Sequence, residues 1–231
     1  MGLAAGEPAQ PARVHGAAPG AGSAGWHCAG GPARHDRHAE RLHPPRGTGG
    51  RLDADAVVGE LFEFRNYGIP LAHHWSTQRT GAAFGTDYLM RTAVAKSNIF
   101  VNTANETTYY YQDLDDQGER LNGSRTYTMH FEAGQLPPVR GFWSLTVYNK
   151  HHFFHPNELD RFSLGTKNKN LAYGQDGSLT LTVGGEAPSD PALHANWLPA
   201  PDEEFTLYLR AYWPDTSIVE GSWQPPAVAR S

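Results

Sequence analysis

Three histidines lie close together after a predicted strand and are the first candidates for metal chemistry. In GFWSLTVYNKHHFFHPN, residues 141–157, they are His151, His152 and His155. A zinc ion needs imidazoles that converge, with ligand nitrogens about 2.0–2.1 Å from the metal. Adjacent residues of an extended strand point to opposite faces, so His151 and His152 cannot both bind one ion, and His155 approaches only if the chain turns back. We therefore predict no metal site and no cofactor, and expect loop hydrogen bonds or ring stacking for these histidines.

Other catalytic patterns in the sequence are weak. Asp113, Asp115 and Asp116 faintly resemble a calcium-binding loop, but the glutamate at the twelfth position is missing, so a plain turn is predicted. Glu203 and Glu204 are adjacent, and adjacency does not place two carboxylates on either side of a substrate. The sequence contains no G-x-S-x-G elbow, no P-loop and no dinucleotide-binding fingerprint.

Arginine and tyrosine side chains are the stronger candidates for binding chemistry. In FTLYLRAYW, residues 205–213, apolar residues alternate with Thr206, Tyr208, Arg210 and Tyr212. Successive side chains of a strand point to opposite faces, so these four share the face turned away from the core. Arginine binds carboxylate or sulfate through two parallel hydrogen bonds, and tyrosine offers a rigid amphipathic ring.

The segments next to this strand complete the predicted binding set. VRGFWSLTVY, residues 139–148, places Arg140 and Tyr148 on its own non-core face, and NWLPAP contributes Asn196 and Trp197. The predicted ligand-binding residues are Arg210, Tyr212, Tyr208, Arg140, Tyr148, Asn196 and Trp197. A structural interpretation stays open beside this one. Threonine and tyrosine are good strand residues that tolerate solvent, Asn196 suits a side-chain-closed turn, and Trp197 suits a plug at the end of a sandwich.

Two helices are predicted ahead of the strands. DADAVVGELFEFR, residues 53–65, places apolar side chains on one side at helical spacing, and its first aspartates suit a helix N-terminus. FGTDYLMRTAVAKSN, residues 84–98, is predicted as a second helix that Thr86 or Asp87 caps. Its apolar stripe consists of Leu89, Met90, Ala93 and Val94.

Period-two alternation predicts the strands that follow residue 107. They are RTYTMHF (125–131), VRGFWSLTVY (139–148), SLTLTV (178–183) and FTLYLRAYW (205–213), with YYYQDLDDQG (109–118) as a further strand entering a turn. Short strands separated by Asp, Gly and Pro turns are typical of an antiparallel β-sandwich. We therefore predict a mainly β fold, an antiparallel jelly-roll-like β-sandwich preceded by two short helices and a disordered N-terminal tail. Tyr127, Trp143 and Trp213 fall on its core side.

Composition separates residues 1–50 from the rest of the 231-residue chain. This segment is rich in Ala, Gly, Pro, Arg and His and contains no Lys, Ile, Phe, Tyr or Asn. Two explanations fit: a disordered tail that cannot bury enough apolar surface to fold, or a GC-rich gene translated in a wrong frame or from a wrong start. We expect residues 1–50 to be disordered, residues 51–106 to form a helical lead-in, and residues 107–231 to form the β-sandwich.

Charge and hydropathy argue against several classes of partner. The net charge is −5 and no basic block of the kind that grips phosphates is present, so no nucleic-acid partner is expected. No apolar run approaches the ~20 residues that span a bilayer, and the N-terminus lacks the pattern of a signal peptide. The single cysteine, Cys28, leaves no intramolecular disulfide and no multi-cysteine zinc site. A soluble protein without an export signal is the resulting prediction.

Several separated strings carry a family resemblance. LPPVRGFWSLTVYN, DGSLTLTV, NWLPAPDEEFTLYLRAYWP and GSWQPP occur in this order, after FGTDYLMRTAVA and LNGSRTYTMHF. Over roughly residues 84–228 the chain resembles the family called domain of unknown function 1214, usually the C-terminal half of two-domain proteins whose N-terminal half is domain of unknown function 1254. The resemblance implies a jelly-roll-like sandwich of bacterial origin, with relatives that are often exported to the periplasm or cell envelope.

The resemblance also implies that an N-terminal partner domain is missing from this chain. Residues 53–75 are then the end of that partner, and their apolar stripe has lost part of its packing surface. An uncovered apolar stripe predicts formation of a homo-oligomer or poor solubility.

Three functional hypotheses follow. The leading one is a non-catalytic β-sandwich binding or accessory module for a carbohydrate-like or other small polar ligand of the cell envelope. The second is a hydrolase- or lyase-type enzyme whose site lies at the interface with the missing domain and uses Arg210, Tyr212 and a histidine as acid and base. The third is a structural oligomerisation domain. The sequence leaves open whether the protein is an enzyme.

Overall fold

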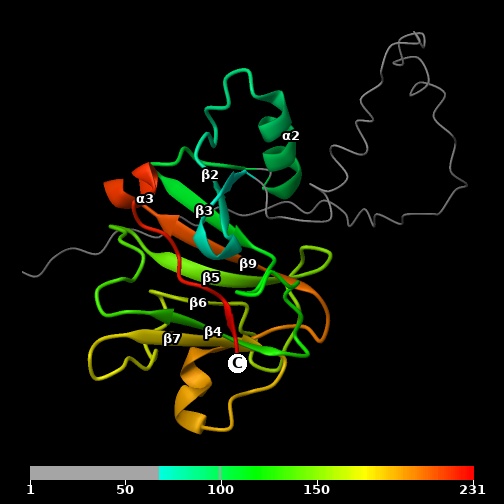
Figure 1. Ribbon diagram of the computed structural model, residues 1–231, viewed down its shortest axis with the longest axis vertical. Coiled ribbons are helices and arrows are strands. Elements are labelled where there is room, and N and C mark those ends of the chain that lie inside the picture. The colour runs from blue at the N-terminus through cyan, green and yellow to red at the C-terminus, as the bar shows by residue number, and fades with distance from the viewer. Residues whose placement is uncertain (1–67, 99) are drawn as a thin grey trace, which may run out of the picture. The chain divides into compact units, whose positions relative to one another are not determined.

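A computed structural model describes residues 68–98 and 100–231 of the chain (Figure 1). The helix predicted over residues 53–65 and the compositionally biased segment 1–50 lie outside these residues.

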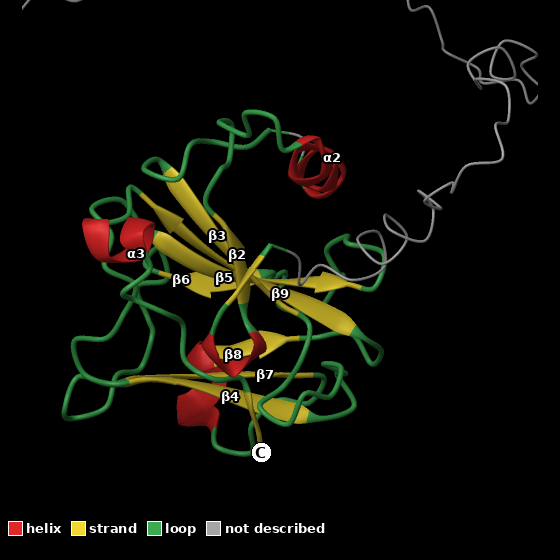
Figure 2. Cartoon of the chain, turned by 45° about the horizontal axis from the view of Figure 1, so that its top comes forward, coloured by secondary structure: helices red, strands yellow, loops and turns green. Residues whose placement is uncertain are grey.

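Two β-sheets form the described part of the chain, and they lie face to face in Figure 2. One sheet has six strands, in the order β1 (Ile69–Pro70), β2 (Ser76–Gln78), β3 (Thr107–Gln112), β9 (Phe205–Tyr212), β5 (Trp143–Asn149) and β6 (Ser163–Gly165). The other has four, in the order β10 (Ala229–Arg230), β4 (Thr126–Phe131), β7 (Leu179–Gly184) and β8 (Trp197–Pro199). The predicted mainly β, sandwich-like fold is confirmed.

One strand pair departs from the predicted antiparallel arrangement. β8 pairs with β7 in parallel, with Val183 opposite Leu198. The connection between these strands runs through a short 3-10 helix, η3 (Pro191–Asn196). A parallel pair needs a crossover of about a dozen residues, and this connection supplies it, so β8 re-enters the sheet in the same direction as β7.

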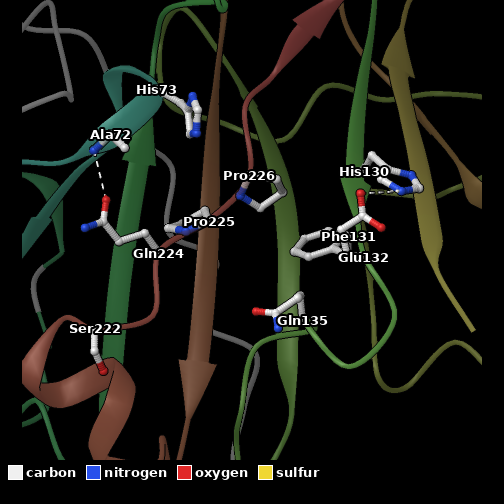
Figure 3. A pocket seen from close by; sticks show the side chains of 10 residues that line it. All are labelled: Ala72, His73, His130, Phe131, Glu132, Gln135, Ser222, Gln224, Pro225 and Pro226. Atoms are coloured by element: carbon white, nitrogen blue, oxygen red, sulfur yellow. Dashed lines mark hydrogen bonds and ion pairs between the residues drawn. The ribbon is translucent and has the colours of Figure 1, made fainter.

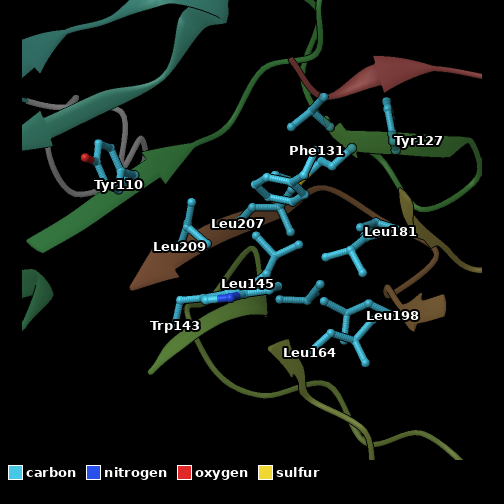
Figure 4. Packing of buried hydrophobic residues seen from close by; sticks show 14 of the residues in the cluster. Tyr110, Tyr127, Phe131, Trp143, Leu145, Leu164, Leu181, Leu198, Leu207 and Leu209 are labelled. Carbon is cyan, nitrogen blue, oxygen red and sulfur yellow. The ribbon is translucent and has the colours of Figure 1, made fainter. Parts of the chain in front are cut away.

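The main core lies between the two sheets and follows the predicted alternation. Trp143, Leu145, Leu207 and Leu209 of the six-stranded sheet are buried, and Figure 4 shows them among buried side chains of the facing sheet. Buried residues of the four-stranded sheet include Tyr127, Met129, Phe131, Leu179, Leu181 and Val183. The core positions predicted for Tyr127 and Trp143 are therefore confirmed.

The alternation fails where a strand ends earlier than its sequence pattern suggests. Trp213 was predicted in the core but is 61% exposed. Its φ of 54° is left-handed, so the chain leaves the strand geometry after Tyr212 and the side chain turns outward. The neighbouring strand β5 begins beside this end of β9, and its regular pairing starts only at Trp143. Before that residue, Val139 forms an isolated bridge with Pro214.

Helix α2 (Tyr88–Ser97) covers the outer face of the six-stranded sheet, on the side away from the four-stranded sheet (Figure 2). Asp87 caps it as predicted, since the Asp87 side chain accepts a hydrogen bond from the Met90 N–H at 2.9 Å. Ala93 and Val94 are buried against Tyr109, Tyr111 and Tyr208. The predicted apolar stripe is wrong for Leu89, which is 50% exposed because it lies one residue off the packed face.

Residues 68–79 contribute more to the sandwich than a helical lead-in would. They form β1, the short 3-10 turn η2 (Ala72–His74) and β2, which pairs with β3. Trp75 is fully buried in the main core, and its indole N–H donates to the Pro226 carbonyl at 2.8 Å. This contact ties the start of the described chain to its C-terminal segment, which follows α3 (Thr216–Glu220).

A buried carboxylate holds the last strand to the turn after β3. Asp115 has no exposed surface, and its carboxylate accepts hydrogen bonds from the N–H groups of Gln117 and Glu119 at 3.0 and 2.9 Å. The Arg230 guanidinium donates to the second oxygen, with Nε at 3.0 Å. The plain turn predicted around Asp115 is therefore organised by this carboxylate.

We expect Asp115 to make folding stability depend on acid. Burial by itself raises the pKa of the Asp115 carboxyl, but hydrogen bonds from Glu119, Arg230 and Gln117 bring the pKa below its usual value. A carboxyl with a lowered folded-state pKa stabilises fully above the ordinary aspartate pKa of about 3.9, and this stabilisation is lost as the pH falls through the folded-state pKa.

Urea unfolding between pH 7 and pH 2 tests this expectation with Asp115→Asn. The variant should lose about 1–3 kcal/mol at pH 7, because the guanidinium and amide donors lose a charged acceptor. The gap to wild type should close in acid, since protonation removes the same charge from the wild-type protein. Parallel pH profiles for the two proteins would show that the Asp115 charge is not coupled to folding.

Candidate functional site

Arg210 lies at the centre of an aromatic group on the outer face of the six-stranded sheet. Its guanidinium carbon is 5.1 Å from the ring centroid of Tyr208, 5.5 Å from that of Tyr148 and 5.8 Å from that of Tyr109. These separations are in the range of cation–π attraction. Together with Thr146, these residues form what we call the Arg210 cluster, built from β3, β5 and β9.

Strand register explains why these side chains meet. In the pairing of β5 with β9, Ser144 lies opposite Arg210 and Thr146 lies opposite Tyr208. In the pairing of β3 with β9, Tyr109 lies opposite Arg210. Residues opposite one another in neighbouring strands point to the same face, so three strands present their outward side chains around one guanidinium.

The hydrogen bonds of Arg210 go to neutral groups. Its Nη1 donates to Thr146 Oγ1 at 3.1 Å, and its Nη2 donates to the Tyr148 hydroxyl oxygen at 2.8 Å. Within residues 68–98 and 100–231, no carboxylate forms an ion pair with Arg210. A guanidinium carries five N–H donors, so most of its hydrogen-bonding capacity is not used by these two contacts.

The electrostatics of the cluster favour an anion. Arg210 is half-buried, and a partly desolvated cation without an anionic neighbour is unfavourable. Burial raises the pKa of the nearby Tyr212 phenol, and the positive charge of Arg210 offsets this only in part. The Tyr212 hydroxyl therefore stays protonated at neutral pH and remains a hydrogen-bond donor.

Aromatic rings border Arg210 on two sides. On one side Tyr212 stacks on Phe142 with ring centroids 4.1 Å apart, and the Lys167 ammonium lies 3.9 Å from the Phe142 ring centroid. On the other side Tyr148 stacks on Phe154 at 5.2 Å. Phe154 also stacks on Phe162 at 5.1 Å and is 52% exposed, so part of an aromatic ring is accessible next to the cluster.

Four of the predicted ligand-binding residues lie together on the outer face, but Arg140 does not lie with them. Arg210, Tyr208, Tyr148 and Tyr212 share the outer face described above. Arg140 is instead 70% exposed in its side chain, with its Nε 4.0 Å from an Asp215 carboxylate oxygen. Strand β5 begins at Trp143, three residues after Arg140, so the alternation along the strand does not predict the direction of the Arg140 side chain.

Asn196 and Trp197 lie with the four-stranded sheet, where their polar atoms serve the fold. Asn196 is buried, its Nδ2 donates to the carbonyls of Ala172 and Thr180, and its Oδ1 accepts from the Ala172 N–H, at 2.7 to 2.9 Å. The Trp197 indole N–H donates to the Gly184 carbonyl at 3.1 Å. Both side chains therefore have structural contacts, although Asn196 bonds to Ala172 and Thr180 and does not close a local turn.

Sequence reasoning missed three members of the site: Tyr109, Thr146 and Phe154. Tyr109 belongs to a run of three tyrosines without a polar–apolar alternation, so its face could not be assigned from the pattern. Thr146 lies on the same predicted strand face as Tyr148, so the alternation of side chains could have identified it. Phe154 follows the end of β5, and its position depends on the turn made by residues 149–153.

That turn also decides the geometry of the histidines. β5 ends at Asn149, whose side-chain oxygen accepts hydrogen bonds from the N–H groups of His151 and Phe153 at 3.0 Å each. Strand alternation therefore does not apply to His151 and His152, contrary to our argument, and His152 has a left-handed φ of 62°. In the described part of the chain, no group of three His, Cys, Asp or Glu side chains is arranged to hold a metal ion.

Comparison with known families places the cluster inside a recognised domain. Residues 106–216 match the model of the family described as "Protein of unknown function (DUF1214)". This segment runs from just before β3 to the start of α3 and includes every residue of the Arg210 cluster. The match supports the family that the sequence strings suggested. No curated protein matches the chain.

Two solved structures are similar to this chain. The VPA0106 protein from Vibrio parahaemolyticus is 31% identical, with a TM-score of 0.49, over 55% of this chain and 31% of that one. A putative uncharacterized protein from Burkholderia cenocepacia is 15% identical, with a TM-score of 0.37, over 63% of this chain and 40% of that one. The chain therefore spans well under half the length of either protein, and the 1254/1214 two-domain arrangement stays a prediction. None of the helices in the described residues is long and apolar enough to span a membrane.

We expect Asn196 to be required for stability. Asn196→Ala removes a buried amide that bonds to three backbone groups of Ala172 and Thr180, which should lower the free energy of unfolding by about 1–3 kcal/mol. The matched control is Asn170→Ala, because Asn170 is exposed. Chemical denaturation measures both, and an equal, small change in the two variants would return Asn196 to the list of ligand-binding candidates.

Proposed function

We propose that this domain is a binding module for a small polar ligand that carries an anionic group. Its binding surface is the part of the outer face around Arg210, Tyr148 and Tyr212, beside the buried residues Tyr109 and Tyr208 that pack against helix α2. The ligand class that fits best is an acidic sugar such as a uronic acid. The observation that carries the proposal is the Arg210 guanidinium, half-buried among tyrosines and without an acidic partner in the described residues.

The unused donors of Arg210 support recognition of a carboxylate. A guanidinium binds a carboxylate most strongly through two parallel N–H donors, which requires that its fork be held in a fixed orientation. The Thr146 and Tyr148 hydroxyls each accept from one terminal nitrogen of the guanidinium, which restricts its orientation and leaves its other N–H donors to a ligand. A carboxylate at these donors would supply the negative charge that the cluster lacks, while Tyr212 adds a neutral hydroxyl donor.

The bordering rings support a sugar as the carrier of that carboxylate. Binding sites for small ligands combine apolar and aromatic surface with a few well-placed polar groups. The half-exposed Phe154 ring and the Tyr212–Phe142 stack provide aromatic surface on two sides of Arg210. A pyranose ring has one apolar face and a rim of hydroxyls, so it can cover an aromatic ring while its carboxylate reaches the guanidinium.

Binding without catalysis is favoured by the side chains at this face. Among the described residues, the Arg210 cluster contains no carboxylate and no imidazole that could act as a general base. A general base works best when its pKa lies near the operating pH, and the raised pKa of Tyr212 moves that phenol further from this condition.

Calorimetric titration with glucuronate at low salt tests the proposal. Wild-type protein should bind glucuronate with an affinity that falls as sodium chloride is added, because the interaction is between opposite charges. Arg210→Met should weaken binding about 10- to 100-fold, which corresponds to the loss of a charge-assisted hydrogen-bond pair. Phe154→Ala should weaken it less.

The matched control for this experiment is Arg140→Met. It removes the same charge from an exposed arginine that lies outside the cluster. Equal glucuronate affinities for Arg210→Met and Arg140→Met would reject the outer face as the binding surface.

A further inference from the structure

A separate cavity of ≈ 380 Å³ lies beside the C-terminal segment (Figure 3). It is lined by the turn between β1 and β2, the end of β4 and residues 222–226, and no member of the Arg210 cluster contributes to it. Its polar side chains are His73, His130, Glu132, Gln135, Ser222 and Gln224. The volume falls within the roughly 300–1,000 Å³ of small-ligand sites.

The turn that presents His73 to the cavity has an unfavourable backbone for its sequence. His73 and His74 have φ angles of 57° and 62°, and the Trp75 N–H donates to the Ala72 carbonyl at 3.2 Å. The register pairs Pro70 with Ser76, so the loop consists of Ala72, His73 and His74, and two of these three residues are left-handed. Glycine and asparagine adopt this conformation more easily than most residues. A histidine in this conformation costs stability, and such strain concentrates at functional sites.

Hydrogen bonds from three segments hold the strained turn in place. The Gln112 amide donates to the His73 carbonyl at 2.6 Å, and the Ala72 N–H donates to Gln224 Oε1 at 3.0 Å. The Trp75 indole N–H donates to the Pro226 carbonyl. The backbone of His73 is therefore held in place relative to residues 224–226.

The lining chemistry suits an uncharged, hydroxyl-rich ligand. Neither lysine nor arginine lines the cavity, and the one carboxylate, Glu132, faces His130 Nε2 at 3.5 Å. No hydrogen bond of the Gln135 side chain or of the Gln224 amide nitrogen is found within the described residues, so the lining offers amide donors and an acceptor. A sugar hydroxyl both donates and accepts, which an amide can satisfy and a charged side chain cannot.

Apolar surface completes the site. In Figure 3, Pro225 and Pro226 lie between Gln224 on one side and His130 with Glu132 on the other. Pro226 is half-buried and offers apolar surface to one side of a sugar, whereas Pro225 is buried. We propose that this cavity is a second binding site, which takes a neutral sugar ring and contacts it through His73, Gln135 and Gln224.

Two tryptophans provide an internal probe of this site. The indole N–H of Trp75 is bonded to Pro226 and that of Trp223 to the Gln135 carbonyl, so both report on residues of the cavity wall. Glucose and N-acetylglucosamine are titrated into ¹⁵N-labelled full-length protein. The Trp75 and Trp223 indole signals should shift in a saturable way with at least one of the two sugars, while the exposed Trp213 indole stays in place.

Three variants separate a binding site from a structural feature. Gln135→Ala should weaken the sugar about tenfold, as expected for the loss of one to two hydrogen bonds. His73→Asn should weaken it as well and raise the melting temperature, because asparagine tolerates the left-handed conformation better. Gln175→Ala, at an exposed glutamine outside the cavity, should bind as wild type does.

The proposal fails on clear outcomes. It is overturned if neither sugar shifts the Trp75 and Trp223 signals at the highest soluble concentration, or if Gln135→Ala and His73→Asn both retain wild-type affinity. Since glucose and N-acetylglucosamine carry no charge, this result is independent of glucuronate binding at Arg210.

Discussion

The alternation of side chains along β9 is the constraint on which the rest of the structure depends. Leu207 and Leu209 point into the main core, and Tyr208 and Arg210, which alternate with them, point to the outer face. Because β9 pairs with β3 on one side and β5 on the other, its register orients both neighbours. The residues that stabilise the sandwich and the residues proposed to bind a ligand are therefore neighbours in one strand, and a shift of one residue would exchange them.

Much of this arrangement could be predicted from the sequence, because alternation within a strand is a local property. The core positions of Tyr127 and Trp143 and the shared face of Tyr208, Arg210 and Tyr212 all follow from parity inside regular strands. The N-terminal cap of α2 was equally local. The family strings pointed to the same domain that the family comparison matched over residues 106–216.

The failures share a physical cause, since they lie where regular strand geometry stops. A left-handed residue turned Trp213 outward, and Arg140 precedes the first paired residue of β5. Asn196 was placed by a long-range pairing to Ala172 that no local pattern encodes. Residues 69–78 joined the six-stranded sheet by pairing with β3, although two- and three-residue strands are too short to show alternation.

Both proposed sites carry a local cost that the fold does not need. Arg210 places a cation among aromatic rings without an acidic partner in the described residues, and His73 occupies a backbone conformation that asparagine or glycine would adopt more easily. Natural sequences tend to be consistent with their structure at every level, and exceptions gather at functional positions. The two exceptions differ in chemistry, since Arg210 is cationic and no lysine or arginine lines the cavity beside His73.

The most direct test of the central claim is the NMR signal of the Arg210 side-chain Nε–H group during a titration with glucuronate. We expect this signal, assigned by its absence from Arg210→Met, to move downfield and saturate as the carboxylate pairs with the guanidinium. The Nε–H signal of Arg140 should stay unchanged in the same experiment. If glucuronate moves other signals of the protein and leaves Arg210 Nε–H in place, the anion binds elsewhere and the account of the outer face is wrong.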